Sequence, residues 1–163
     1  MRAVSIGSEA VARGDLTRHE LQRWHSPVFP GVYAAQGKQL SLRDRTEAAW
    51  LWSRRGGIVA GVAASALHGA QWVDADVPIE LIWPNTRPPQ GIIAREQTFA
   101  DDEVTRVAGI PVTTLARTAC DLGRHLPRAI ALVEYHVDRN KIAKASHDKT
   151  WKKRHRGVKY LRL

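Results

Sequence analysis

The chain has 163 residues, a net charge of +9 and an apolar fraction of 44%. These values fit one globular domain, or a small module joined to a larger one, and exclude a chain that is disordered throughout. The single cysteine, Cys120, excludes an intrachain disulfide and a cysteine-rich zinc site. The absence of a signal peptide after Met1, and of an apolar run long enough to span a bilayer, predicts a cytoplasmic protein with no membrane partner.

The charge is unevenly spread along the chain. Residues 1–55 carry nine Lys and Arg against five Asp and Glu, and residues 56–137 carry six against nine. Residues 138–163 carry ten against two. Two basic ends around a slightly acidic middle predict a polyanionic partner for the ends and a different partner for the middle.

Two short helices are predicted near the N-terminus. The first spans Ser8–Arg13, with Ser8 as its N-cap. The second starts at Thr17, because Thr17 and Glu20 have the spacing of a capping box, and it ends near Trp24. Its predicted inward residues are Leu16, Leu21 and Trp24.

Helix, tight turn and helix together have the size of a helix-turn-helix, whose second helix enters the major groove of DNA. The segment Val28–Tyr33 follows as two short strands around a Pro-Gly turn, as in a wing. Arg and Gln are residue types that contact bases and phosphates. The candidate DNA-binding residues here are Thr17, Arg18, His19, Gln22 and Arg23, flanked by Tyr33 and Lys38. The alternative is a helical hairpin that only packs on the core.

The segment Leu42–Ala70 is predicted to build the core. Apolar and small residues recur at helical spacing from Leu42 to Ser53, and the Gly56-Gly57 pair is predicted to break this helix. A second helix, rich in alanine, is predicted from Gly61 to His68. We interpret the two as a buried helical hairpin.

Short strands and further helices follow. Strands are predicted at Ile79–Trp83, Gly91–Arg95, Val104–Val107 and Ile110–Val112. Helices are predicted at Leu115–Gly123, capped by Thr113 or Thr114, and from Leu126 to about Asn140. This order indicates an α+β fold. The predicted divisions are a winged helix-turn-helix-like module at 1–40, an α+β domain at 41–138 and a basic tail at 139–163.

The basic tail has too few apolar residues to bury a core of its own. It is predicted to contact DNA phosphates, with Lys152, Lys153, Arg154 and Arg156 at its centre. The alternative is a tail that only keeps the protein in solution.

No catalytic pattern stands out in the sequence. The carboxylate–lysine pair of metal-dependent nucleases is absent, the Asp74 and Asp76 pair fits a polar turn, and no histidine has metal-ligand spacing with cysteine. No Ser sits in a nucleophile elbow. We therefore predict a protein that is not an enzyme and needs no metal or cofactor.

Several segments together resemble the AbiEi-like antitoxin family of type IV toxin–antitoxin systems. They are SEAVARGDLTRHEL, VFPGVY, RTEAAWLWSRRGGIVAGVAASALHGAQWV, PIELIWP and GIPVTTLARTACDLGR, in the family's order across residues 5–125. Arg117 and Asp121 match a recurring Arg and Asp of the family's antitoxin domain, and their (i, i+4) spacing favours a structural pair.

The resemblance implies a winged helix-turn-helix that binds operator DNA and represses its own promoter. It also implies an antitoxin domain that opposes a nucleotidyltransferase-type toxin. Proteins of this type often continue into a Vsr-like endonuclease domain, whereas this sequence stops at HRGVKYLRL, where a linker would lie. The alternatives to an active antitoxin are therefore a protein-interaction module and a remnant of a larger, nuclease-fused protein.

Overall fold

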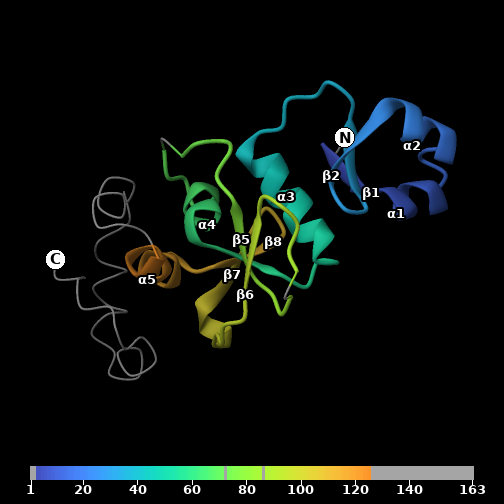
Figure 1. Cartoon of the computed structure of the whole chain (residues 1–163). Helices are drawn as coiled ribbons and strands as arrows, with labels where there is room; N and C mark the ends of the chain where they lie inside the picture. Colours follow the sequence, from blue (N-terminus) through green and yellow to red (C-terminus); the bar gives the residue numbers. More distant parts are fainter. Residues whose placement is uncertain (1–2, 72, 86, 126–163) are drawn as a thin grey trace.

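The computed structural model describes residues 3–71, 73–85 and 87–125, and these residues form an α+β fold with two sheets (Figure 1). The N-terminal elements lie at one end of the molecule and α5 lies toward the other end. The predicted helix from Leu126 and the basic tail, with Lys152, Lys153, Arg154 and Arg156, lie outside the described residues.

A three-stranded antiparallel sheet organises the N-terminal part. Its strands are β1 (Val4–Ile6), β3 (Val32–Ala35) and β2 (His25–Phe29), in that spatial order. Two helices, α1 (Gly7–Ala12) and α2 (Arg18–Trp24), connect β1 to β2. The predicted strand pair around Pro-Gly is confirmed as the β2–β3 hairpin. The three residues of β1 were too few to show a strand pattern in the sequence.

The predicted N-cap of the first helix is wrong. Ile6 is the N-cap of α1 and makes no side-chain cap, whereas Ser8 lies inside the helix. The reason is that β1 runs directly into α1, and the backbone N–H of Gly7 donates to the carbonyl of Gly31 at 3.0 Å. The turn of the β2–β3 hairpin therefore satisfies the backbone donor of the first residue of α1, and the helix begins one residue before Ser8.

A mixed five-stranded sheet forms the larger part of the molecule. Its spatial order is β6 (Ile92–Arg95), β5 (Ile79–Ile82), β4 (Ile58–Ala60), β8 (Ile110–Thr113) and β7 (Val104–Val107). The pairs β4–β5 and β7–β8 are antiparallel, and the pairs β4–β8 and β5–β6 are parallel. The four strands predicted in this region are confirmed.

The predicted helical hairpin is wrong, because the central strand β4 separates α3 (Leu42–Trp52) from α4 (Gly61–Leu67). All three residues of β4 are buried, so the apolar run that starts at Ile58 is partly a strand covered on both faces. The helix α3 ends at Trp52, before the glycine pair, and Arg54 and Arg55 after it both have positive φ. Gly56 and Gly57 instead allow close approach of Trp83 and of the Ser53 hydroxyl.

One continuous core joins the two sheets, and α3 lies between them. The core contains Val4 and Val32 from the small sheet, Ala48 and Leu51 from α3, and Leu81 from the large sheet. An N-cap at Ser41 fixes the start of α3, since its hydroxyl accepts from the backbone N–H of Asp44 at 3.2 Å. Burial of small residues in α3 lets the backbones of both sheets come close to the helix.

The C-terminal described helix, α5 (Leu115–His125), follows β8 and contacts α4. Thr114 rather than Thr113 supports its first turn, because the Thr114 hydroxyl accepts from the backbone N–H of Arg117 at 3.4 Å. A short 3₁₀ turn, η1 (Asp101–Glu103), precedes β7. No helix within residues 3–71, 73–85 and 87–125 combines the length and the apolar character needed to cross a membrane.

Candidate nucleic-acid interface

The second helix, α2, is held at its start by the predicted capping box. The Thr17 hydroxyl accepts from the backbone N–H of Glu20 at 3.2 Å, and the Glu20 carboxylate accepts from the backbone N–H of Thr17 at 2.8 Å. The Thr17 hydroxyl also donates to the Glu20 carboxylate at 2.7 Å, and the bonds that the carboxylate accepts from the Thr17 backbone N–H and hydroxyl lower the pKa of Glu20. The box therefore fixes where α2 begins without help from the core.

A single apolar contact seats α2 on the rest of the N-terminal part. Leu21 is its one residue that is not fully exposed, and no residue of α2 is buried. A Cβ added to Gly7 would lie 2.8 Å from Leu21 Cδ2 and 2.7 Å from Tyr33 Cε2. The leucine and the tyrosine ring thus meet over a glycine at the start of α1. This leaves nearly the whole surface of α2 open to solvent.

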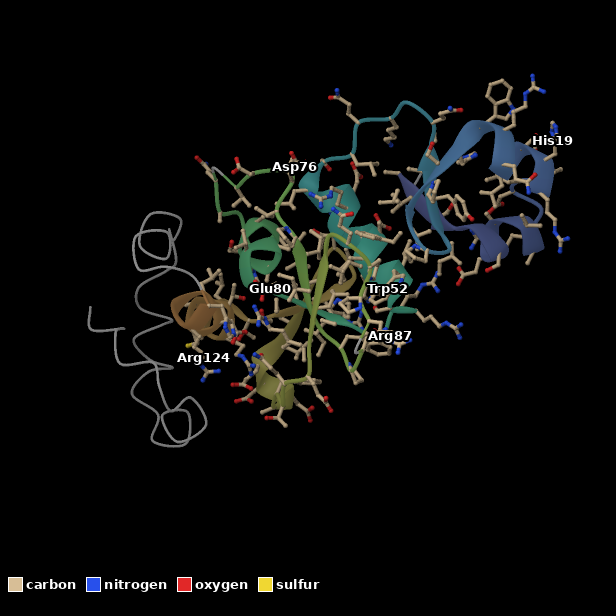
Figure 2. The ribbon with its side chains drawn as sticks, in the orientation of Figure 1. His19, Trp52, Asp76, Glu80, Arg87 and Arg124 are labelled. Carbon is tan, nitrogen blue, oxygen red and sulfur yellow. The ribbon has the colours of Figure 1, made fainter. Side chains whose placement is uncertain are left out.

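The polar residues predicted to contact DNA lie on that open surface. Arg18, His19, Gln22 and Arg23 are all exposed, and Figure 2 shows His19 pointing away from the five-stranded sheet. Within the described part of the chain, their side chains form no hydrogen bond or ion pair with other residues. Arg13 differs, because its guanidinium binds Asp15 at 2.9 Å. The free donors of α2 are therefore available to a partner.

The prediction that Trp24 points inward is wrong. Its side chain is 57% exposed, and the Arg23 guanidinium carbon lies 5.2 Å from the centroid of its ring. The helix ends here because His25 already belongs to β2, and Leu21 alone makes the inward contact. The spacing of Leu21 and Trp24 suited a core face, but a helix of seven residues has only one such contact to make.

The flanking residues of the candidate interface have different environments. Tyr33 is half-buried in β3, and its ring packs against Gly7 next to Leu21 of α2. Lys38 is exposed in the loop after β3. The same loop is tied to the end of α2, since the backbone N–H of Gln36 donates to the Trp24 carbonyl at 2.8 Å. The loop that carries Lys38 is therefore anchored next to the C-terminal end of α2.

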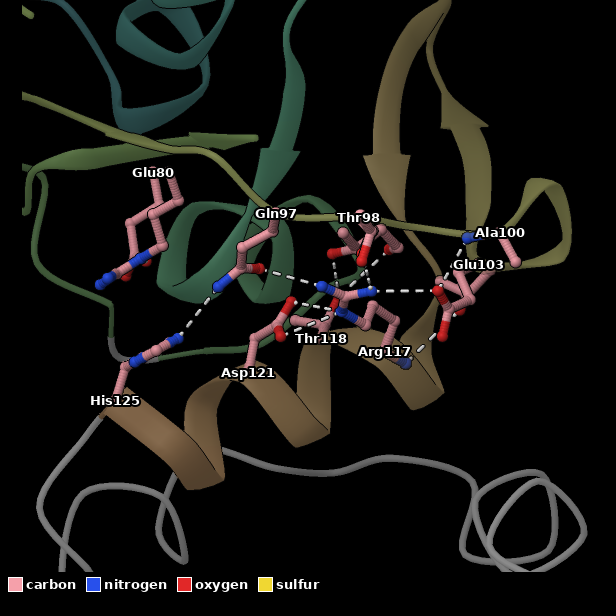
Figure 3. A network of polar contacts seen from close by, with 12 residues as sticks. Glu80, Gln97, Thr98, Ala100, Glu103, Arg117, Thr118, Asp121 and His125 are labelled. Carbon is pink, nitrogen blue, oxygen red and sulfur yellow. Dashed lines mark hydrogen bonds and ion pairs between the residues drawn. The ribbon is translucent and has the colours of Figure 1, made fainter. Parts of the chain in front are cut away.

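A second polar cluster surrounds Arg117 in the other half of the molecule (Figure 3). The Arg117 Nε donates to both carboxylate oxygens of Asp121 at 3.0 Å, as the spacing predicted. One terminal nitrogen binds Glu103 at 3.0 Å and the Thr98 carbonyl at 3.3 Å, and the other binds the Gln97 side chain at 2.9 Å. The donors of the Arg117 guanidinium therefore bind acceptors inside the protein.

Burial governs the chemistry of this cluster. Arg117 is 3% exposed and Asp121 is 2% exposed. Burial raises the pKa of Asp121, and the charge of Arg117 opposes that rise. Burial also raises the pKa of the neighbouring Cys120 thiol to about 12. The Arg117 guanidinium is thus held by acceptors of the protein itself, next to a thiol that its high pKa keeps protonated at neutral pH.

A surface hollow of about 520 Å³ adjoins the cluster. It is lined by the segment before η1 and by α5, and it includes Phe99, whose side chain is 45% exposed, and Arg124. Gln97 extends the polar contacts to the other side, where its amide donates to the His125 ring at 3.4 Å. Burial lowers the pKa of His125, in keeping with a ring nitrogen that accepts.

Comparison with known proteins gives no assignment. The sequence matches no family model, and it matches no curated protein. Within the described residues, no three His, Cys, Asp or Glu side chains gather in a way that could hold a metal ion.

Sequence reasoning found the polar face of α2 and missed its aromatic end. It also missed Gln97, Thr98 and Glu103 as partners of Arg117, which lie 14 to 20 residues away along the chain. No local pattern reports such a contact, because it depends on how the segment before β7 crosses α5. The one sequence feature that could have indicated an exposed Trp24 is its position as the last residue of α2, directly before β2.

Proposed function

We propose that this chain is a non-catalytic DNA-binding protein of the antitoxin and autorepressor type, with a winged helix-turn-helix in residues 1–40. The observation that carries the proposal is the surface of α2. A helix that buries none of its residues contributes little to the core, yet this one is capped, seated on Tyr33 and lined with unpaired Arg and Gln side chains. Such a helix is suited to contact with a partner.

The dimensions of α2 fit a major groove. An α-helix with its side chains is about 10–12 Å across, and the major groove is about 12 Å wide. With α2 in the groove, Arg18 and Gln22 would reach base edges, as Arg suits guanine and Gln suits adenine. The β2–β3 hairpin would lie beside the same stretch of DNA, in the position of a wing.

The number of available cations limits the strength of this interface. Arg18, Arg23 and Lys38 are the cations on the proposed face that form no ion pair within the described residues. With Arg18 on a base edge, Arg23 and Lys38 leave two phosphate contacts, which would give a slope of about −1.8 for the logarithm of the binding constant against the logarithm of salt concentration. A steeper slope would mean that residues 139–163 add phosphate contacts, as proposed for Lys152, Lys153, Arg154 and Arg156.

Fluorescence anisotropy with duplexes tiled across the DNA upstream of the gene tests the proposal. The double variant R18A/Q22A should remove preference for one tile over a scrambled duplex. The matched control R87A removes the same charge from an exposed arginine in the larger half, and it should bind like the wild type. Equal binding of wild type to all tiles, unchanged by R18A/Q22A, would contradict a role for α2 in reading DNA.

A second candidate function is a protein-interaction module whose partner is a nucleotidyltransferase-type toxin. The exposed Phe99 beside the hollow favours it, because large exposed aromatic side chains are common at protein interfaces. Co-purification of the tagged chain with proteins encoded by neighbouring genes, compared between wild type and F99A, tests this function. Retention of the same partner by F99A would exclude the hollow as the binding surface.

A further inference from the structure

The exposed end of α2 holds the largest side chain of the N-terminal part in water. Trp24 is 57% exposed, while the other large apolar residues of this part are buried or half-buried. Its indole contacts the Arg23 guanidinium, whose carbon lies over the ring at 5.2 Å from the centroid. That distance is within the range of a cation–π contact.

The backbone under this pair is fixed on both sides. The Trp24 carbonyl accepts from the backbone N–H of Gln36 at 2.8 Å, and His25 begins β2. The indole therefore extends from backbone that is hydrogen-bonded to the segment after β3, and it gives the guanidinium a surface to contact. An exposed arginine is otherwise free to adopt many rotamers, and ordering it on binding costs free energy.

The contact with the ring leaves the donors of the guanidinium open. The N–H groups lie in the plane of the guanidinium, so a contact made by its face leaves them able to donate. No carboxylate within the described residues forms an ion pair with Arg23. A planar, ordered fork of donors with no internal acceptor is matched to a phosphate.

We propose that Trp24 is a positioning residue that holds the Arg23 guanidinium in place for a bidentate contact with a phosphate of duplex DNA. This inference rests on the proposed function. The N-terminal residues of a recognition helix contact base edges, and Arg23 lies at the opposite end of α2, where the sugar–phosphate backbone passes. Arg23 thus fixes register, whereas Arg18 and Gln22 read bases.

The test is a double-mutant cycle in DNA binding, measured by anisotropy with a fluorescein-labelled 30-base-pair duplex at several salt concentrations. R23A should reduce the salt slope by about 0.9, the value for one phosphate. W24L should weaken binding by about 2–5-fold, the size of a cation–π contact at an exposed site. W24L should have no further effect in the R23A background. W24F, which keeps a ring, should lose less than W24L.

Controls separate positioning from folding. The melting temperature of W24L should match that of the wild type, since the indole is mostly in water. R23K offers a second route to the answer, because lysine keeps the charge but provides no planar fork. R23K should therefore retain the salt slope and weaken binding.

Two results would overturn the inference while leaving the proposed function in place. One is an equal loss from W24L in the wild-type and R23A backgrounds, which would mean that the indole contacts DNA by itself. The other is unchanged binding by W24L when R18A/Q22A still loses sequence preference. Absence of any DNA binding by the wild type at low salt would overturn both the inference and the proposed function.

Discussion

Replacement of Arg117 by methionine should destabilise the fold more than any surface substitution. The change keeps the length and apolar stem of the side chain and removes every donor that reaches Asp121, Glu103 and Gln97. Two carboxylates that are 2% and 5% exposed would then lack their cation. Removal of one partner of a buried ion pair costs about 3–5 kcal/mol.

The loss should be visible by two measurements. At about 2–4 °C for each kcal/mol in a domain of this size, the melting temperature should fall by roughly 6–20 °C. Urea unfolding followed by circular dichroism should show the same loss in free energy of unfolding. The control R43M, at an exposed position of α3, should change that free energy by less than about 0.5 kcal/mol.

The stability lost in R117M should also depend on pH. Burial already raises the pKa of Asp121 above the ordinary value of an aspartate, so the folded state favours its protonated form. The corresponding stability is present below that value and is lost as the pH rises through the folded pKa. R117M removes the positive charge that opposes the rise in the Asp121 pKa. The pH range over which protonated Asp121 stabilises the fold should therefore extend to higher pH.

The defect of R117M should therefore be smaller at pH 5 than at pH 8. The triple variant R117M/D121N/E103Q, which removes the charges together, should regain much of the lost stability at pH 8. A loss below about 1 kcal/mol for R117M, or a loss that is the same at both pH values, would refute the view that this cluster is a buried charge network.

Three further predictions concern local packing and reactivity. G7A should lower the free energy of unfolding by about 1–3 kcal/mol, because its methyl group would overlap the Tyr33 ring, whereas G123A in open space should be neutral or stabilising by up to about 1 kcal/mol in the same urea titration. T17A should cost about 1 kcal/mol and speed amide hydrogen exchange in the first turn of α2, and unchanged exchange would argue against the capping box. Cys120, buried with a pKa of about 12, should resist a thiol reagent at pH 8 until urea unfolds the chain, and rapid labelling of the native protein would contradict its burial.

Local signals in the sequence predicted the local parts of the structure. The Thr17 capping box, the Pro-Gly hairpin and four strands of the larger sheet each depend on neighbouring residues, so their patterns were readable. The strands β1 and β4 were missed because three residues each cannot display a periodicity. The apolar run from Ile58 was compatible with helix or strand, and only its place between two other strands decides for strand.

The candidate site was predictable to the same extent. The exposed polar residues of α2 follow from the start of the helix, which the capping box fixes, and from its period. The Arg117–Asp121 pair follows from its spacing, but its remaining partners depend on tertiary crossing. The predicted inward orientation of Trp24 was wrong. Periodicity indicates which residues share a face of a helix, but it does not indicate whether another element covers that face.

The helix α3 contacts every strand of the small sheet as well as β4 and β5 of the large sheet. The two sheets therefore share one interior, and rotating one sheet against the other would expose buried apolar residues of α3, such as Leu51, to water.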